Sequence, residues 1–176
     1  MKNPCLVIID VQEKLFPVMN EKQSLLRNLI TLIKGFQLYK LPVIITEQVP
    51  EKLGNTIDEV ASLFDKVDPI VKSSFSCFGE PKFLERLETI NTDKIILAGI
   101  ESHVCVYQTS LDLIEQRKHV EIVTDSISSR NVNNHNLAIE RMKMEGVSLT
   151  SVEMLLFSFQ KNANGDNFKK LVKLVK

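Results

Sequence analysis

Three reactive side chains in this sequence each follow a short apolar run. Asp10 follows CLVII, Lys72 follows DPIV, and Cys105 comes shortly after IILAG. In an open parallel sheet the carboxyl ends of the strands form one edge, where ligands bind. If these runs are strands, they bring a carboxylate, an ammonium and a thiol to that edge. A thiol that attacks a carbonyl, beside a carboxylate that takes its proton, is the chemistry of a cysteine hydrolase.

Cys105 is the candidate nucleophile. The residues Gly99 to Glu101 turn from a strand into a helix, and Ser102 is predicted to be the N-cap, which puts Cys105 in the first helical turn. The positive end of the helix dipole would stabilise a thiolate there, and the free N–H groups would hold an oxyanion. The alternative is that Cys105 is a small buried hydrophobic residue, as many free cysteines are.

Asp10 and Lys72 have ordinary alternatives too. A carboxylate at a strand end is either a cap on the next segment or the general base of a site. A lysine is usually a solvated surface charge. Between a carboxylate and a thiol, however, the ammonium of Lys72 would lower the thiol pKa and keep Asp10 ionised.

Aromatic residues and a second cysteine flank the same predicted loops. Phe16, Phe75 and Phe78 are candidates for an apolar wall around a substrate, with core packing as the alternative. Cys77 is interpreted as packing or pocket wall, and Cys5 as core.

The three histidines have no metal-ligand spacing, so we interpret all of them as surface residues and expect no metal and no cofactor. They are His103, His119 and His135.

Six apolar runs alternate with helical patterns along the whole chain. The runs are Leu6–Ile9, Val43–Thr46, Pro69–Val71, Ile95–Ala98, Val120–Val123 and Val147–Leu149. Uniformly apolar strands separated by helices are typical of a parallel sheet covered on both faces. We therefore predict a three-layer α/β/α fold with a six-stranded parallel sheet, as a single domain over residues 1–176. Thr150 and Asp166 are predicted to cap the last two helices.

The composition limits the partners. Lys plus Arg and Asp plus Glu both number 22, so the formal net charge is +0, which gives no reason to expect nucleic acid or an anionic membrane as a partner. No apolar segment approaches the ~20 residues that span a bilayer, and no leader peptide is visible at the N-terminus. Three cysteines, an odd number, favour a reducing compartment, so we expect a cytoplasmic protein.

Four motifs resemble the isochorismatase-like hydrolase superfamily. They are IIDVQEKLF around Asp10, ITEQVP, VKSSFSCF around Lys72, and LAGIESHVCVYQTSLDL around Cys105. They occur in order, and the resemblance covers essentially the whole chain. It is strongest to the small isochorismatase-domain proteins of the cytoplasm and mitochondrion, so the mitochondrion stays open as a compartment.

The resemblance implies a Rossmann-like sheet and a catalytic triad of Asp10, Lys72 and Cys105. It also implies a cis peptide bond between Ile100 and Glu101, which would turn N–H groups toward an oxyanion beside that of Cys105. A small-molecule substrate and a homo-oligomer are implied as well.

Departures from the family pattern narrow the chemistry. Nicotinamidases of this superfamily bind a metal through an aspartate and histidines, and the segment TEQVPEKLGN has neither. Isochorismatases cleave a vinyl ether without needing a cysteine, so the thiol favours an amide-like C–N bond. Gln12 and Glu47 are candidate substrate contacts. Vinyl ether hydrolysis, a non-catalytic binding or assembly module, and a redox role for the cysteine remain as alternatives.

Overall fold

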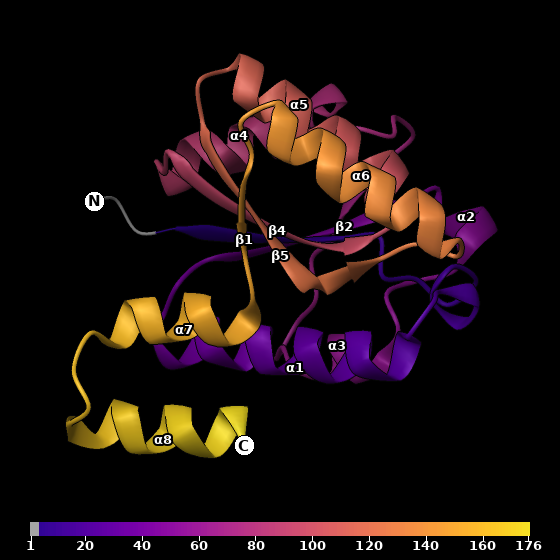
Figure 1. The fold of residues 1–176 in the computed structure, drawn as a ribbon. Helices are drawn as coiled ribbons and strands as arrows, with labels where there is room; N and C mark the ends of the chain where they lie inside the picture. Colours follow the sequence, from indigo (N-terminus) through magenta and orange to yellow (C-terminus); the bar gives the residue numbers. More distant parts are fainter. Residues whose placement is uncertain (1–3) are drawn as a thin grey trace.

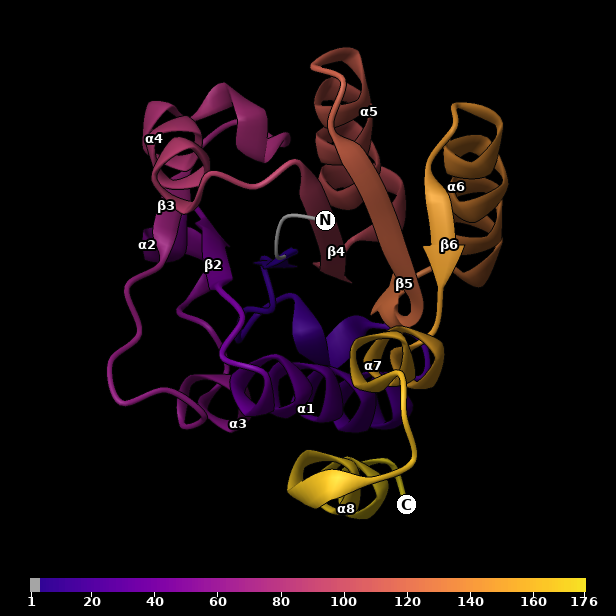
Figure 2. The ribbon, with the colours of Figure 1, turned by 90° about the vertical axis from the view of Figure 1, so that its left-hand side faces the viewer.

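The computed structural model describes residues 4–176, and in them six strands form one sheet (Figure 1). The strands are β1 (Cys5–Ile9), β2 (Val43–Gln48), β3 (Ile70–Lys72), β4 (Lys94–Ile100), β5 (His119–Ser128) and β6 (Ser148–Thr150). Every pairing is parallel, and the order across the sheet is β3-β2-β1-β4-β5-β6 (Figure 2). The predicted three-layer α/β/α fold with six parallel strands is confirmed.

The sheet has a switch point beside its central strand. The chain moves outward from β1 to β2 and β3, and then returns to pair β4 with the other side of β1. In the registers, Ile9 lies opposite Thr46 on one side and opposite Gly99 on the other. A crevice at the carboxyl ends of such strands is the usual ligand site of an open α/β sheet.

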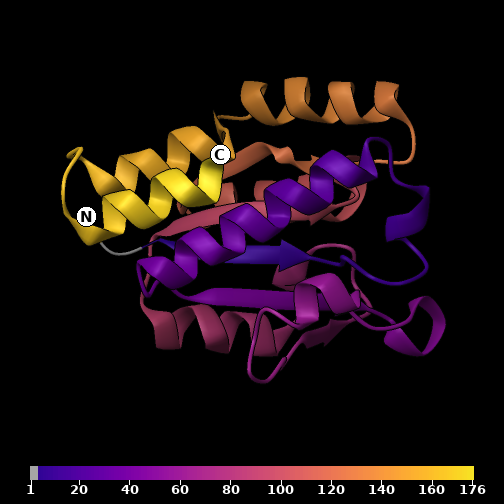
Figure 3. The ribbon, with the colours of Figure 1, turned by 90° about the horizontal axis from the view of Figure 1, so that it is seen from below.

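Helices cover both faces of the sheet (Figures 1 and 3). One face carries α4 (Pro81–Ile90), α5 (Tyr107–Glu115) and α6 (Val132–Met144). The other face carries α1 (Lys22–Leu38) and α7 (Val152–Gln160), with the short α3 (Asp58–Ala61) beside α1. A further helix, α8 (Gly165–Val175), packs on the outside of α1 and α7, while α2 (Pro50–Leu53) follows β2.

The strand side chains alternate between two hydrophobic clusters. Leu6 and Ile8 of β1 belong to the cluster under α1 and α7, whereas Cys5, Val7 and Ile9 belong to the cluster under α4, α5 and α6. All five are fully buried. Burial on both faces explains why the strands are uniformly apolar in the sequence.

Two predicted helix caps are wrong by one or two residues. Thr150 ends β6, and the neighbouring Ser151 caps α7 with its hydroxyl, which accepts from the Met154 N–H. Asp166 lies inside the first turn of α8, where Asn164 holds the N-cap position. In both places adjacent residues have capping side chains, and only the backbone decides which one lies at the helix start.

No helix within residues 4–176 is both long enough and apolar enough to cross a membrane.

Candidate active site

Asp10 leaves the end of the central strand β1 in the left-handed backbone region, with φ 53°. This is an uncommon conformation for a residue other than glycine. Its side chain is fully buried. Oδ1 accepts a hydrogen bond from Thr46 Oγ1 at 2.8 Å, and Oδ2 forms an ion pair with Lys72 Nζ at 2.7 Å. Apart from that ion pair, Oδ2 has no hydrogen-bond partner among residues 4–176.

Lys72 is the last residue of β3, and its ammonium is enclosed by acceptors. Besides Asp10, Nζ donates to Gln48 Oε1 at 2.6 Å and to the carbonyls of Ser74 at 3.2 Å and Phe75 at 3.1 Å. Burial is the largest single effect and lowers the pKa of Lys72, but Asp10, Cys105 and Cys77 together outweigh it, so the net shift of the pKa is upward. The side chain is therefore a buried cation, although lysines are rarely buried without a partner.

Two residues of this network, Thr46 and Gln48, were not predicted as site residues. The sequence reasoning took only Glu47 from the TEQ segment, yet alternate residues of a strand share a face. Thr46 and Gln48 therefore share one face of β2, where Thr46 contacts Asp10 and Gln48 contacts Lys72, while Glu47 points to the other face. The alternation of side-chain direction along a strand, with a period of two residues, was the sequence signal that could have identified Thr46 and Gln48.

Cys105 lies in a wide helical turn, η3 (Ser102–Val106), that follows β4. The Ile100–Glu101 peptide bond at its start is cis, as expected. The Glu101 carbonyl accepts from the N–H groups of Val104 at 3.1 Å and Val106 at 3.3 Å, a π-type pattern that passes over Cys105. The predicted N-cap, Ser102, is wrong, because Ser102 is the first residue inside the turn and makes no capping hydrogen bond.

The Cys105 thiol is 7% exposed and has a raised pKa, not a lowered one. Burial is the largest cause, and the negative charge of Asp10 acts in the same direction. Lys72 lowers the pKa, as predicted, but its effect is smaller than those of burial and Asp10. The resting thiol is therefore protonated, and its proton can leave only when a base takes it.

Cys77 lies in the same electrostatic environment. It is fully buried in the short turn η2 (Cys77–Gly79), and its Sγ lies 3.9 Å from Thr46 Oγ1. Burial and the charge of Asp10 raise its pKa to about 11. Cys77 thus lies beside the buried Asp10–Lys72 ion pair, in line with its interpretation as packing or pocket wall.

The side chains of Gln12 and Glu47 form hydrogen bonds with other residues of the protein. The Gln12 amide donates to the carbonyls of Gln48 at 3.0 Å and Gly54 at 2.6 Å, and accepts from the Gln48 N–H at 2.7 Å. Glu47 Oε1 accepts from both the N–H and the hydroxyl of Thr56, each at 2.7 Å. Both side chains are buried and hold the loop after β2. Their role as substrate contacts stays a prediction.

The three phenylalanines do not form one apolar wall. Phe16 packs against the cluster under α1 and α7, on the opposite side of the sheet from the ion pair. Phe78 packs against the other cluster and lines a separate cavity of about 490 Å³ with Leu84 and Leu87. Phe75 is exposed, and its backbone carbonyl holds Lys72. Of the three, Phe75 is the one that forms a hydrogen bond with a residue of the predicted triad.

The connection between β5 and α6, together with the first turn of α6, holds the Cys105 turn in place. His135 Nδ1 and Ser102 Oγ are 2.9 Å apart, and His103 Nδ1 and Ser129 Oγ are also 2.9 Å apart. The Arg130 N–H donates to Glu101 Oε2 at 3.0 Å.

Two of the three histidines therefore have structural partners, which corrects their interpretation as surface residues; His119 is exposed. Among the described residues, no group of three His, Cys, Asp or Glu side chains could hold a metal ion.

Comparison with known proteins gives consistent similarities. Residues 4–154 match the family described as Isochorismatase domain. Isochorismatase domain-containing protein 2 of Danio rerio is 32% identical, over 99% of this chain and 87% of its own. The secreted isochorismatase effector Isc1 of Phytophthora sojae is 33% identical, over 97% of this chain and 83% of its own.

Solved structures are similar over nearly the whole chain. A Caenorhabditis elegans protein described as MAR1 ribonuclease has a TM-score of 0.90 and 31% identity, covering 99% of this chain and 90% of that one. YcaC of Escherichia coli, described as an octameric hydrolase of unknown specificity, has a TM-score of 0.92 at 20% identity, covering 98% and 88%. The second likeness concerns the fold alone.

Proposed function

This chain belongs to the isochorismatase family, and from that premise we propose that it is a metal-independent hydrolase of a small molecule with Cys105 as its nucleophile. One observation carries the proposal. A fully enclosed Asp10–Lys72 ion pair, 2.7 Å long, lies at the switch point of the sheet beside a thiol whose pKa it influences. A buried ion pair stabilises a fold only weakly, and perturbed titratable groups cluster at functional sites.

In the proposed reaction, the Cys105 sulfur attacks the carbonyl carbon of an amide-like substrate. Asp10 takes the thiol proton as the C–S bond forms, and then gives it to the leaving nitrogen as the C–N bond breaks. This leaves a thioester, which water hydrolyses to the acid and the free thiol. The raised pKa of the thiol supports a role for Asp10 as base, because the nucleophile is not ionised beforehand.

Lys72 is proposed to keep Asp10 ionised until the thiol proton arrives. It contacts Asp10 directly and is held by three further acceptors, so the cation cannot swing out to solvent without losing them. Backbone N–H groups of the turn, that of Cys105 and those around Ile100 and Glu101, are proposed to hold the oxyanion.

The direct test is intact-mass analysis after incubation with a panel of small amides and an acyl-transfer probe. We expect an acyl adduct on the wild-type protein and on the matched control Cys77→Ala, and no adduct on Cys105→Ala. An adduct that persists in Cys105→Ala and maps to Cys77 or Cys5 would overturn the assignment. Saturable ligand binding without any adduct or turnover would favour the non-catalytic binding module, and turnover of a vinyl ether with no adduct would favour isochorismatase-type chemistry.

A second candidate function, RNA cleavage, comes from the solved structure described as a ribonuclease at 31% identity. The balanced charge of this chain, 22 basic and 22 acidic residues, argues against it, since nucleic-acid binding depends on a basic surface. Incubation of labelled RNA with the wild-type protein and with Cys105→Ala decides the matter. RNA cleavage that follows the purified protein would replace the amide proposal.

We also propose that the protein is a homo-oligomer, a state that the description of YcaC gives for that neighbour. The cytoplasmic location stays a prediction, because the Phytophthora relative is described as secreted.

A further inference from the structure

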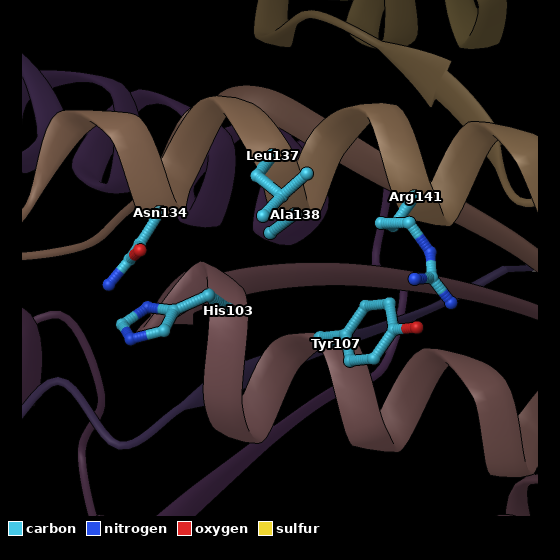
Figure 4. Close-up of a pocket in the computed structure, with 6 residues that line it drawn as sticks. All are labelled: His103, Tyr107, Asn134, Leu137, Ala138 and Arg141. Atoms are coloured by element: carbon cyan, nitrogen blue, oxygen red, sulfur yellow. The ribbon is translucent and has the colours of Figure 1, made fainter.

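A cavity of about 250 Å³ lies between the Cys105 turn and helix α6 (Figure 4). It is lined by His103, Tyr107, Asn134, Leu137, Ala138 and Arg141. The first two side chains come from η3 and the start of α5, and the other four come from α6. None of the catalytic candidates lines it.

The cavity is separate from the predicted active site, although it borders the same turn. His103 and Tyr107 lie two residues before and two residues after Cys105. Side chains two residues apart on a helix point to different faces, so the turn presents its thiol on one side and this cavity on the other. A molecule in the cavity would not be the substrate attacked by Cys105.

Each polar side chain of the cavity can offer a hydrogen-bond donor, and Arg141 offers only donors. Figure 4 shows the Arg141 guanidinium next to the Tyr107 hydroxyl, and the Asn134 amide over the His103 ring. The Ser129 hydroxyl, itself buried, occupies Nδ1 of His103, which fixes the ring and leaves only Nε2 for a ligand. None of the six lining residues in the described part of the chain is acidic.

The remaining wall is apolar. Leu137, which is 57% exposed, and the buried Ala138 lie between the two polar ends. An exposed leucine beside a guanidinium matches a ligand with a hydrocarbon body and an anionic group, since Arg binds carboxylates with paired hydrogen bonds. The volume is below the roughly 300–1,000 Å³ typical of drug-sized ligands, so the molecule must be small.

We propose that this cavity is a second, non-catalytic site that binds a small organic carboxylate, with Arg141 as the principal anion contact. The competing acceptor is Glu145, one turn further along α6, whose carboxylate lies 3.6 Å from the Arg141 guanidinium. Both side chains are about half exposed, so this pair is weak and a ligand can replace it.

The test uses benzoate as the probe and full-length Cys105→Ala as the protein, so that the outcome does not depend on catalysis. We expect saturable binding by NMR titration, with Tyr107 ring and Ala138 methyl signals shifting, and no binding of the neutral benzamide. Arg141→Gln should weaken binding by about tenfold or more. Lys143→Gln, an exposed cation on the same helix, is the matched control and should change nothing.

A second variant separates binding from a structural effect. Glu145→Gln removes the competing carboxylate and should strengthen benzoate binding, whereas mere damage to α6 would weaken it. Equal loss in Arg141→Gln and Lys143→Gln, or benzamide binding as tightly as benzoate, would overturn the proposal. So would dissociation of an oligomer by Arg141→Gln without any loss of benzoate binding, because the cavity would then be a contact between copies of the chain.

Discussion

At the scale of single residues, Asp10 combines three unusual properties. Its backbone is left-handed, its carboxylate is fully buried, and its two oxygens serve different partners, the Thr46 hydroxyl and the Lys72 ammonium. Uncommon backbone conformations at non-glycine residues tend to occur at functional sites. Here the conformation turns the chain at the end of β1 so that the carboxylate stays beside Lys72.

The pKa of the Cys105 thiol should respond in opposite directions to its two charged neighbours. Asp10 raises that pKa and Lys72 lowers it, so Asp10→Asn should lower the pH midpoint of Cys105 alkylation and Lys72→Met should raise it. In the wild type the midpoint should lie above the ~8.5 of an ordinary cysteine. Iodoacetamide labelling across pH, read by mass spectrometry of the Cys105 peptide, measures all three. A wild-type midpoint below that of an ordinary thiol would contradict the structure.

Removing one member of the buried ion pair should lower the free energy of unfolding more than removing both members. Asp10→Ala leaves an uncompensated buried ammonium, and we expect the free energy of unfolding to fall by about 3–5 kcal/mol. The double variant Asp10→Leu/Lys72→Met replaces the charges by apolar groups of similar size and should recover most of that loss. Urea denaturation of the two variants makes the comparison. Equal destabilisation would mean that Lys72 finds other compensation in the single variant.

The sequence could identify these residues but not the way they are bonded. Residue type and position after an apolar run were enough to select Asp10, Lys72 and Cys105. The roles of Thr46, Gln48 and Gln12 depend on side-chain directions in a folded sheet. The upward shift of the thiol pKa depends on how completely the site is buried. Neither quantity can be read from spacing.

At the scale of secondary-structure elements, Gly99 determines how closely β4 approaches β1 below the site. Its φ is +112°, and a Cβ at this position would collide with the backbone of Ile9. Backbone atoms of a central strand cannot move aside as a flexible side chain can. β4 therefore reaches Glu101 and the Cys105 turn only because residue 99 has no side chain.

Gly99→Ala should lower the free energy of unfolding and disturb the site more than a comparable glycine substitution. The matched control is Gly146→Ala, which also has a positive φ, +87°, but has nothing within 4 Å of the added Cβ. The control should cost only the conformational penalty of about 1–2 kcal/mol. Thermal melting and Cys105 labelling would measure both effects. Similar losses in the two variants would show that the contact with Ile9 is unimportant.

The helix starts were harder to predict than the strands. The central strands β1 and β4 are buried on both faces, so each one appears in the sequence as a nearly unbroken apolar run. At the start of α7, by contrast, Thr150 and Ser151 are both suitable N-cap residues. Ser102 likewise has the residue type of an N-cap in front of Cys105. The π-type bonding of Glu101 to Val104 and Val106 has no signature in residue type.

At the scale of the whole molecule, the fold could be predicted from the alternation of strands and helices, and the order of the strands agrees with ligand binding at a switch point. What the alternation does not reveal is which surfaces remain open. The cavity beside α6 and the half-exposed residues around it depend on how the helices lie on the sheet.

We predict that the whole molecule self-associates into a homo-oligomer. Native mass spectrometry and sedimentation velocity should give a mass that is a multiple of the 20.0 kDa chain. The charge-neutral composition offers little repulsion between copies. A sharp single species at the chain mass over the whole concentration range would exclude the homo-oligomer.

The position of β1 between β2 and β4 also affects the order in which the strands pair during folding. β1 and β2 are near neighbours along the chain, but β4 must close a long loop before it pairs with β1, and such long-range closure is entropically slow. Asp10 and Cys105 meet only across that last junction. A refolding chain that has formed its helices and outer strands therefore still carries a chemically ordinary thiol. The proposed nucleophile and its proposed base come into contact only when the two halves of the sheet join.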